Sequence, residues 1–230
     1  GSAYIFKRNG STWNQQQKLT ASDGASNDYF GYSVSLYEDY ALIGVYGDDS
    51  SKGSAYIFKR NGSTWIQQQK LTANDGASSD RFGISVSIYK DYALIGAYKD
   101  DSNKGSAYIF KRNGSIWNQQ QKLTASDGAS DDEFGRFVSL YGDYALIGAP
   151  EDDTERGSAY IFKRNGSTWI QQQKLTASDG ASDDRFGYSV SLYEDYALIG
   201  AHRDDDNGFL SGSAYIFKRN DSTWSQQQKL

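Results

Sequence analysis

Apolar and polar residues alternate with a period of two in four short runs near the start of this chain. The runs cover residues 3–7, 13–19, 33–37 and 40–45, and clusters of Gly, Asn, Ser and Asp separate them. Such alternation predicts half-buried β-strands, whereas an amphipathic helix repeats every three to four residues. Asn9-Gly10 joins the first two runs and is a strong hairpin signal, because both residues tolerate positive φ. The pattern therefore predicts four antiparallel strands and no helix.

This unit recurs along the whole chain. The octapeptide Gly-Ser-Ala-Tyr-Ile-Phe-Lys-Arg starts at Gly1, Gly53, Gly105, Gly157 and Gly212. A four-stranded meander of about 50 residues cannot bury both faces alone, so tandem copies are expected to stack as the blades of a β-propeller. A β-solenoid is the main alternative, but its coils are usually shorter and lack such hairpins. We therefore expect an all-β fold, with residues 1–230 forming a single β-propeller of four-stranded antiparallel blades.

A second signature lies between the octapeptides. In the third unit it reads Phe134-Gly135 before one strand and Gly148-Ala149-Pro150 after the next, and the other units keep the Phe-Gly pair. In these residues the chain resembles the FG-GAP repeat of integrin α-subunit β-propellers, and most closely the tandemly amplified bacterial versions. The resemblance implies that the strand after Phe-Gly is innermost and the Trp-led strand outermost. It places four complete blades at residues 30–81, 82–133, 134–185 and 186–230.

Residues 1–29 then form an outer half-blade, because they supply a third and a fourth strand without the inner pair. Four and a half blades is an awkward number, since closed propellers usually have four to eight. Two explanations stay open: the chain is a fragment of a longer array, with which the absence of Met agrees, or another chain completes the half-blade. Exchange of hairpins between protomers would give a homo-oligomer.

Composition narrows the class of protein without identifying a ligand. Aromatic residues make up 15% of the chain, which favours strands, and the absence of cysteine excludes a disulfide framework. The net charge of −5 comes without a concentrated basic patch, so no nucleic-acid partner is expected. No run of about 18 apolar residues occurs, so no membrane insertion is expected.

Charge is expected to divide between the two ends of the blades. The Lys-Arg pairs of the octapeptides fall at one end, with the turns between strands 1 and 2 and between strands 3 and 4. Most aspartates fall in the loops at the other end. We therefore predict a basic face and an acidic face, although solubility and the turn-forming chemistry of Asp account for the same distribution.

The acidic loops contain the candidate metal ligands. The calcium loop of integrin-type propellers does not carry over, because the matching turn here is only Glu38-Asp39. Instead, each loop before Phe-Gly places two carboxylates and several carbonyls around a glycine turn, which suits Ca²⁺, and no other cofactor is expected. Structural Asx turns are the alternative. The candidate ligands are Asp23, Asp28, Asp75, Asp80, Asp127, Asp132, Asp179 and Asp184.

The candidate binding residues are positions that differ between otherwise similar units. They flank Phe-Gly and would ring the mouth of the central channel, where mixed aromatic and arginine residues are typical of a ligand or partner site. Neutral variation at exposed positions explains the same pattern. These residues are Tyr29, Tyr32, Arg81, Ile84, Glu133, Arg136, Arg185 and Tyr188. Phe137 replaces a serine of the other units and is expected to plug the channel. The longer fourth unit adds Phe209 and Leu210, either as a contact patch or as packing over a neighbouring loop.

Two function hypotheses follow. The first is a non-enzymatic binding or adhesion module, extracellular or at the cell surface, that presents a propeller face to a protein or glycan partner; the resemblance to adhesion propellers motivates it. The second is a structural scaffold that self-assembles through its half-blade and has no evolved small-molecule ligand. An enzyme is disfavoured because His202 is the only histidine and the aspartates repeat in every blade, whereas an active site would break that symmetry.

Overall fold

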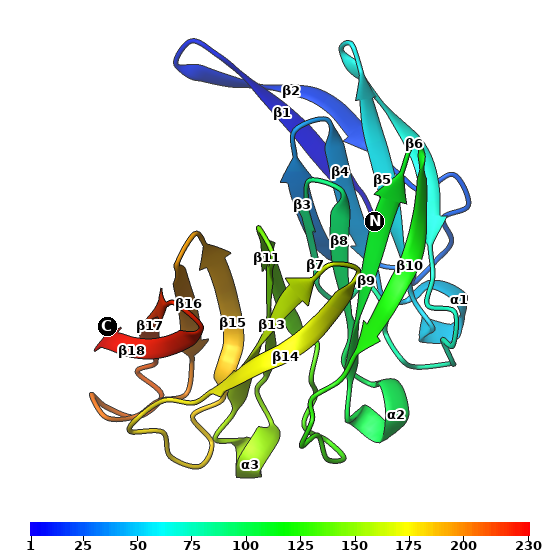
Figure 1. Cartoon of the computed structure of the whole chain (residues 1–230). Helices are drawn as coiled ribbons and strands as arrows, with labels where there is room; N and C mark the ends of the chain where they lie inside the picture. The colour runs from blue at the N-terminus through cyan, green and yellow to red at the C-terminus, as the bar shows by residue number, and fades with distance from the viewer.

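The structure, a computed structural model that describes residues 1–230, is an open arc of five antiparallel sheets (Figure 1). Four sheets have four strands each, and the N-terminal sheet has two. The sheets do not close into a ring, and the first and last sheets lie at the free ends of the arc. The predicted all-β fold of four-stranded blades with an N-terminal half-blade is confirmed.

Each complete blade places its four strands in chain order from the axis of the arc outward. The half-blade consists of β1 (Ala3–Asn9) and β2 (Thr12–Leu19). Blade 1 consists of β3 (Ser33–Tyr37), β4 (Tyr40–Val45), β5 (Ser54–Asn61) and β6 (Thr64–Leu71). Blade 2 consists of β7 (Val86–Tyr89), β8 (Tyr92–Ala97), β9 (Ser106–Asn113) and β10 (Ile116–Leu123). Blade 3 consists of β11 (Phe137–Tyr141), β12 (Tyr144–Ala149), β13 (Ser158–Asn165) and β14 (Thr168–Leu175). Blade 4 consists of β15 (Phe186–Tyr193), β16 (Tyr196–Ala201), β17 (Ser213–Asn220) and β18 (Thr223–Lys229).

Short helical turns occur where the pattern predicted loops without helix. They are α1 (Asp48–Ser51), α2 (Asp100–Asn103) and α3 (Asp152–Glu155), and they follow one another along the same edge of the arc (Figure 1). Asp49 and Ser50 have φ of 48° and 59°, so α1 is not a regular right-handed helix. No helix in the structure has both the length and the apolar character needed to cross a bilayer.

The hydrophobic core lies between neighbouring blades. Tyr40 and Leu42 of blade 1 share a buried cluster with Val86 and Ile88 of blade 2. Equivalent clusters lie between blades 2 and 3 and between blades 3 and 4. Burying one such aliphatic side chain contributes about 1.5–3 kcal/mol, so the stacking of blades, rather than any single blade, stabilises the fold.

Serine side chains link the inner strands of neighbouring blades. The hydroxyl oxygen of Ser35 accepts the backbone N–H of Ile88 at 3.0 Å, and that of Ser87 accepts the N–H of Leu140 at 3.0 Å. A small hydroxyl suits this position, because the inner strands pack closely around the axis. These bonds satisfy donors that strand pairing leaves free.

Phe-Gly marks the point where one blade meets the next. Phe82 is fully buried, and its ring centre lies 5.4 Å from that of Tyr108. Gly83 has a φ of 89°, and a methyl group there would overlap the carbonyl oxygen of Ser54. Gly53 forms a parallel bridge with Phe82 and has equally little space. Both glycines are therefore required by close backbone approach between consecutive units.

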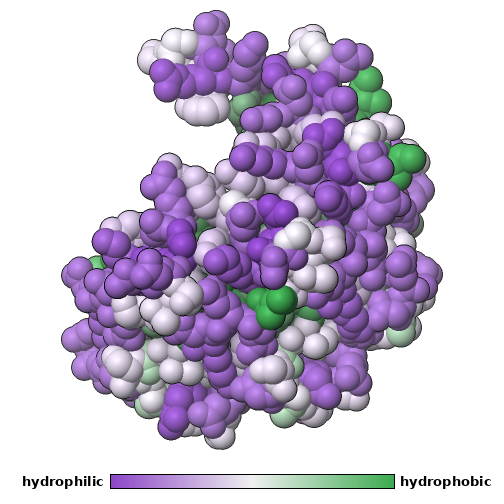
Figure 2. Space-filling view, in the orientation of Figure 1, coloured by the Kyte–Doolittle hydropathy of each residue, from purple (hydrophilic) through white to green (hydrophobic).

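The two ends of the arc expose apolar residues whose counterparts are buried elsewhere. Val34 and Leu36 on β3 are 62% and 61% exposed, whereas Val86 is 7% exposed. On the half-blade Trp13 is exposed, and so is Tyr196 at the opposite end. The space-filling view shows a deep notch between these ends (Figure 2).

Candidate functional site

Side chains from all four blades enclose a cavity of about 120 Å³ at the Phe-Gly end of the inner strands. We call the lining residues the mouth cluster. They are Tyr32, Tyr46, Arg81, Ile84, Tyr98, Arg136, Phe137 and Tyr188. Five of them were predicted from the sequence, and Phe137 forms part of the wall, its ring centre 4.8 Å from that of Tyr188.

A strained turn places the variable residue before each Phe-Gly. Arg81 has a φ of 59°, its N–H donates to the carbonyl of Ser51 at 2.9 Å, and its own carbonyl accepts the N–H of Ile84 at 3.2 Å. The equivalent residues Tyr29, Glu133 and Arg185 also have positive φ. A non-glycine residue in this region costs about 1–2 kcal/mol, and such strain clusters at functional sites.

Arg81 is the distinctive cation of the mouth cluster. Its guanidinium lies 5.6 Å from the ring centres of Tyr46 and of Tyr98, and it donates a hydrogen bond to the Tyr98 hydroxyl. No carboxylate lies within 4.0 Å of it. An arginine held by aromatic rings and lacking an acidic partner is suited to bind an anionic group.

The other two arginines predicted for the mouth are neutralised within the protein. Arg136 pairs with Glu133 and stacks on Tyr98 at 4.8 Å. Arg185 pairs with Glu151 at 3.1 Å and with Glu155 at 2.6 Å. These ion pairs distinguish Arg136 and Arg185 from Arg81.

His202 borders the mouth cluster through Tyr188. The two ring centres are 3.8 Å apart. Partial burial lowers the pKa of His202, and the positive charges of Arg203, Arg185 and Arg136 lower it further. The imidazole is therefore a neutral neighbour of the cavity at physiological pH.

The predicted binding residues thus fall into three groups. Tyr32, Arg81, Ile84, Arg136 and Tyr188 line the cavity. Tyr29 stacks on Tyr46 at 4.9 Å, while Glu133 and Arg185 form the ion pairs described above. Phe209 and Leu210 line no part of it. Phe209 is 90% exposed, so it is not packed over a neighbouring loop.

Sequence reasoning missed Tyr46 and Tyr98. Both follow the Gly-Val or Gly-Ala that ends the second strand, and the other units have Pro150 and His202 at that position. The signal was therefore present, because this position varies between units as much as those beside Phe-Gly. It was overlooked because the position is distant in sequence from the Phe-Gly pair.

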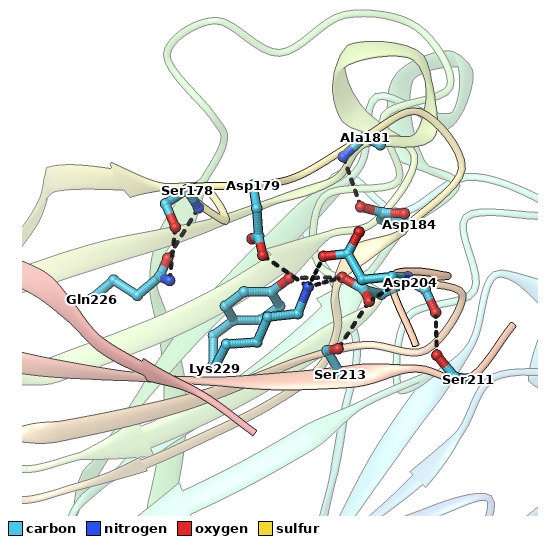
Figure 3. Close-up of polar contacts among 11 residues, drawn as sticks. Ser178, Asp179, Ala181, Asp184, Asp204, Ser211, Ser213, Gln226 and Lys229 are labelled. Atoms are coloured by element: carbon cyan, nitrogen blue, oxygen red, sulfur yellow. Dashed lines mark hydrogen bonds and ion pairs between the residues drawn. The ribbon is translucent and has the colours of Figure 1, made fainter. Parts of the chain in front are cut away.

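A lysine lies among the aspartates of the acidic loops. In blade 4, Lys229 Nζ lies 2.8 Å from Asp179 and 2.7 Å from Asp204 (Figure 3). Asp204 also accepts hydrogen bonds from Ser213 at 3.0 Å and Tyr215 at 2.8 Å. The buried carboxylate of Asp204 therefore has a complete set of partners inside the protein.

The same arrangement recurs in the other complete blades. Lys122 Nζ lies 2.6 Å from Asp75 and 2.5 Å from Asp100. Burial alone would lower the pKa of Lys122 and raise that of Asp75. The bonds of Lys122 to Asp100 and to Asp75 outweigh burial, so the lysine pKa is raised and the pKa of Asp75 is lowered. Lys70 pairs with Asp23 and Asp48, and Lys174 with Asp127 and Asp152.

The second aspartate of each acidic loop bonds to its own backbone. Asp80 accepts the N–H of Ala77 at 2.6 Å, and Asp28, Asp132 and Asp184 do the same three residues upstream. Burial raises the pKa of Asp80, Asp132 and Asp184. These bonds run to the residue three positions earlier, whereas in an Asx turn the side chain accepts the N–H two residues further on, so they differ from the Asx turns that the sequence offered as an alternative to metal ligation.

Calcium binding stays a prediction. Each first aspartate is bonded to a lysine, and each second aspartate to the loop backbone. Asp179, Asp204 and Asp206 bring their carboxylate oxygens within 4.8 Å of one another, and the ammonium of Lys229 contacts all three. The lysine therefore supplies the positive charge at this cluster.

The opposite end of the blades has an arc of tyrosines. The ring centres of Tyr37, Tyr89, Tyr141 and Tyr193 lie 4.9 to 5.1 Å apart along the inner strands. At this end each arginine of the predicted basic face in the complete blades pairs with an aspartate of the neighbouring turn, as Arg60 does with Asp39. These pairs leave the lysines as the unneutralised charges of the octapeptides in blades 1 to 4.

Comparison with known proteins agrees with this geometry. A family model described as FG-GAP repeat matches residues 13–58, 65–110, 117–162 and 169–217. Among solved structures, a protein from Lactobacillus plantarum is similar with a TM-score of 0.65 and 14% sequence identity. The match covers 95% of this chain and 59% of that protein, so the present chain spans about three-fifths of its length. At this identity the likeness concerns the fold alone.

Proposed function

This chain belongs to the FG-GAP repeat family, and from that premise we propose that it is a non-enzymatic binding module whose mouth cluster receives an acidic group of a protein or glycan partner. Arg81 carries the proposal, because its guanidinium faces an aromatic cavity and has no carboxylate partner. A charge-assisted hydrogen bond to such a group is about twice as strong as a neutral one.

The size of the cavity narrows the class of ligand. About 120 Å³ suits one acidic side chain or one charged substituent of a sugar, rather than a whole ligand. The tyrosine walls would contact the apolar part of that group. The rest of the partner would lie across the surrounding loops. Extracellular or cell-surface location is part of this proposal and rests on the likeness to adhesion propellers.

A binding screen tests the proposal. The full chain is applied to arrays of acidic glycans and acidic peptides, and any hit is titrated with Arg81→Gln and with Arg8→Gln, an exposed arginine of the half-blade. Arg81→Gln should weaken binding by roughly tenfold or more, because a hydrogen bond to a charged group contributes about 1.5–3 kcal/mol. Arg8→Gln should bind as the parent chain does. Equal binding by all three proteins, or no acidic binder at all, would contradict the proposal.

A second candidate function is a scaffold that self-assembles through the ends of the arc. Tyr40 packs edge-on against Trp117 of the next blade at 5.8 Å, and this contact recurs twice more. At the two ends, Trp13 and Tyr196 are the exposed members of that pair, 66% and 46% exposed. Contact between Tyr196 of one molecule and Trp13 of the next would be heterologous and could build rings or filaments.

Sedimentation velocity across a range of concentrations tests this candidate. The parent chain should associate, and Trp13→Glu should reduce association. Ile66→Glu, at an exposed apolar position on an outer strand, serves as the matched control and should associate like the parent. A strict monomer at every concentration would rule the scaffold out.

A further inference from the structure

β1 has one unpaired edge. It pairs with β2 alone, in a two-stranded sheet. The equivalent strand of blade 1, β5, has the same sequence but pairs with β4 on one side and β6 on the other. The free edge of β1 therefore presents the backbone groups that β4 satisfies on β5.

The complete blades show which strand covers this edge and in which register. On β5, Tyr40 lies opposite Lys59, Leu42 opposite Ile57, and Gly44 opposite Ala55. Blades 2, 3 and 4 repeat this register with Tyr-Ala-Leu-Ile-Gly-Ala. All four complete blades therefore cover this edge with nearly the same strand sequence in the same register.

An apolar groove of about 540 Å³ runs beside the open edge. Ten of its twelve lining residues are hydrophobic, and they come from β1, β2, β3 and β4. Val34 and Leu36 form its inner part and are more than 60% exposed. Their counterparts Val86 and Ile88 are buried because Tyr40 and Leu42 of the preceding blade cover them. The groove lacks the equivalents of these two side chains.

Two further residues of blade 1 lie where they would contact a tyrosine equivalent to Tyr40, which the half-blade lacks. In blade 2, Trp117 lies 5.8 Å from the ring of Tyr40, and the Arg112 guanidinium lies 4.9 Å from the same ring. Their counterparts in blade 1 are Trp65 and Arg60. The Arg60 side chain is 43% exposed against 27% for Arg112, as expected if one covering ring is missing.

We propose that this groove accepts the inner β-hairpin of a further copy of the repeat. The donor strand, with the sequence Tyr-Ala-Leu-Ile-Gly-Ala or Tyr-Ala-Leu-Ile-Gly-Val, runs antiparallel to β1. Its tyrosine lies opposite Lys7, its leucine opposite Ile5 and its glycine opposite Ala3. Main-chain hydrogen bonds provide affinity, and alternate side chains in the groove provide specificity.

This inference deepens the second proposed function and is independent of the mouth cluster. Acceptance of a free hairpin does not require the chain to self-associate. A chain that stays monomeric at all concentrations removes the scaffold function but leaves hairpin binding to be measured. The two failures are therefore distinguishable.

A synthetic peptide with the sequence of residues 33–45 tests the groove on the full chain. It contains one inner hairpin of the repeat, from Ser33 to Val45. Binding should be saturable, and alternate backbone amides of β1 should gain protection from hydrogen exchange. Leu36→Asp should weaken binding at least about tenfold, since it places a charge where a buried leucine side chain would pack. Ile66→Asp should bind as the parent does, because Ile66 is similarly exposed, 54% against 61% for Leu36, but lies outside the groove.

An extended chain provides a second test that does not rely on a destabilising substitution. A further copy of residues 30–52 is joined in front of Gly1, which reproduces the sequence that precedes Gly53. The added hairpin should occupy the groove, raise the thermal unfolding temperature and abolish binding of the peptide.

Three outcomes would overturn the proposal. The first is no saturable binding of the peptide, and the second is binding that Leu36→Asp or the extended chain leaves unchanged. The third is saturable binding of the peptide that leaves the β1 amides unprotected, which would place the peptide away from this edge. Saturable binding lost in both altered proteins, with β1 protected only when peptide is present, supports it.

Discussion

The side-chain amide of Gln69 on β6 pairs with both backbone groups of Trp117 on the neighbouring blade. Its Oε1 accepts the N–H of Trp117 at 2.8 Å, and its Nε2 donates to the carbonyl oxygen at 2.7 Å. The outer strands of adjacent blades are too far apart to pair directly. The glutamine amide therefore makes the two backbone hydrogen bonds that a neighbouring strand would otherwise make. The same pair of hydrogen bonds recurs between Gln17 and Trp65, Gln121 and Trp169, and Gln173 and Trp224.

Replacement of this glutamine should therefore weaken the contact between adjacent blades and destabilise the fold. Gln69→Ala removes two hydrogen bonds and leaves both backbone groups of Trp117 unpaired, so the free energy of unfolding should fall by about 1–3 kcal/mol. Urea denaturation followed by tryptophan fluorescence measures the loss. Gln228→Ala is the matched control, because Gln228 occupies the same repeat position in blade 4 and has no further blade to bond. Equal losses in the two variants would contradict the role of the amide as a clamp.

Removal of the central lysine of an aspartate cluster should destabilise the chain and change its response to acid. Lys122→Met leaves Asp100, itself buried, without its cation, at a cost of about 2–3 kcal/mol after allowance for solvent around the lysine. Lys18→Met provides the control, because Lys18 holds the same position in the half-blade and forms no ion pair. A loss of similar size in Lys18→Met would refute the ion-pair account.

The sign of the pH dependence follows from the pKa directions. The pKa of Asp75 is lowered in the folded chain, so its stabilisation is present above its unfolded pKa of about 4 and is lost as the pH falls further. The raised pKa of Lys122 keeps the lysine charged at neutral pH. The raised pKa of Asp80 acts in the opposite direction, since its penalty is relieved as the pH falls. In Lys122→Met the gain in unfolding free energy between about pH 3 and pH 5 should be smaller than in the parent chain.

The sequence predicted the blades well because the fold repeats a strong local pattern. Strand alternation specifies each meander, Asn-Gly turns support it in every unit except the last, which has Asn220-Asp221, and the octapeptide locates each copy. The short turns α1 to α3 were missed because left-handed residues such as Asp49 and Ser50 leave no hydrophobic period. The bulge in each outer strand was missed as well. Gln68 has no partner on β5, and its side chain instead donates to Ser115 on the next blade at 2.7 Å.

The candidate site was only partly predictable, because its charges are paired across loops. Arg81, Arg136 and Arg185 all occupy positions beside Phe-Gly that vary between units, so the sequence does not distinguish them. In the structure, only Arg81 has no carboxylate partner. Likewise, Asp75 and Asp80 look like two ligands of one loop, but Lys122 comes from a strand 47 residues further along the chain. Pairing of this kind depends on the register between blades, which a single unit of sequence does not contain.

His202 should report on the mouth cluster by NMR. As the only histidine, it gives one imidazole signal, and its pKa should lie below 6.5 because of partial burial and nearby arginines. Arg203→Gln should raise that pKa, whereas Lys90→Gln, near the opposite end of the inner strands, should leave it unchanged. A lowered folded pKa means that the stabilisation from neutral His202 is present above pH 6.5 and decreases as the pH falls through that value. A His202 pKa at or above 6.5 would contradict the described environment.

The glycine of Phe-Gly should be far less replaceable than a turn glycine with a similar backbone conformation. Gly83 has a φ of 89°, and a methyl group there would overlap the carbonyl oxygen of Ser54, whereas Gly62 has a φ of 62° and open space around it. Gly62→Ala should lower the free energy of unfolding only by the cost of a left-handed backbone at a non-glycine residue, about 1–2 kcal/mol. Gly83→Ala must also push apart two consecutive units, so its loss should exceed about 3 kcal/mol. Thermal and urea unfolding of both variants measures the difference, and similar losses would mean that backbone conformation alone, rather than contact between units, explains the Phe-Gly motif.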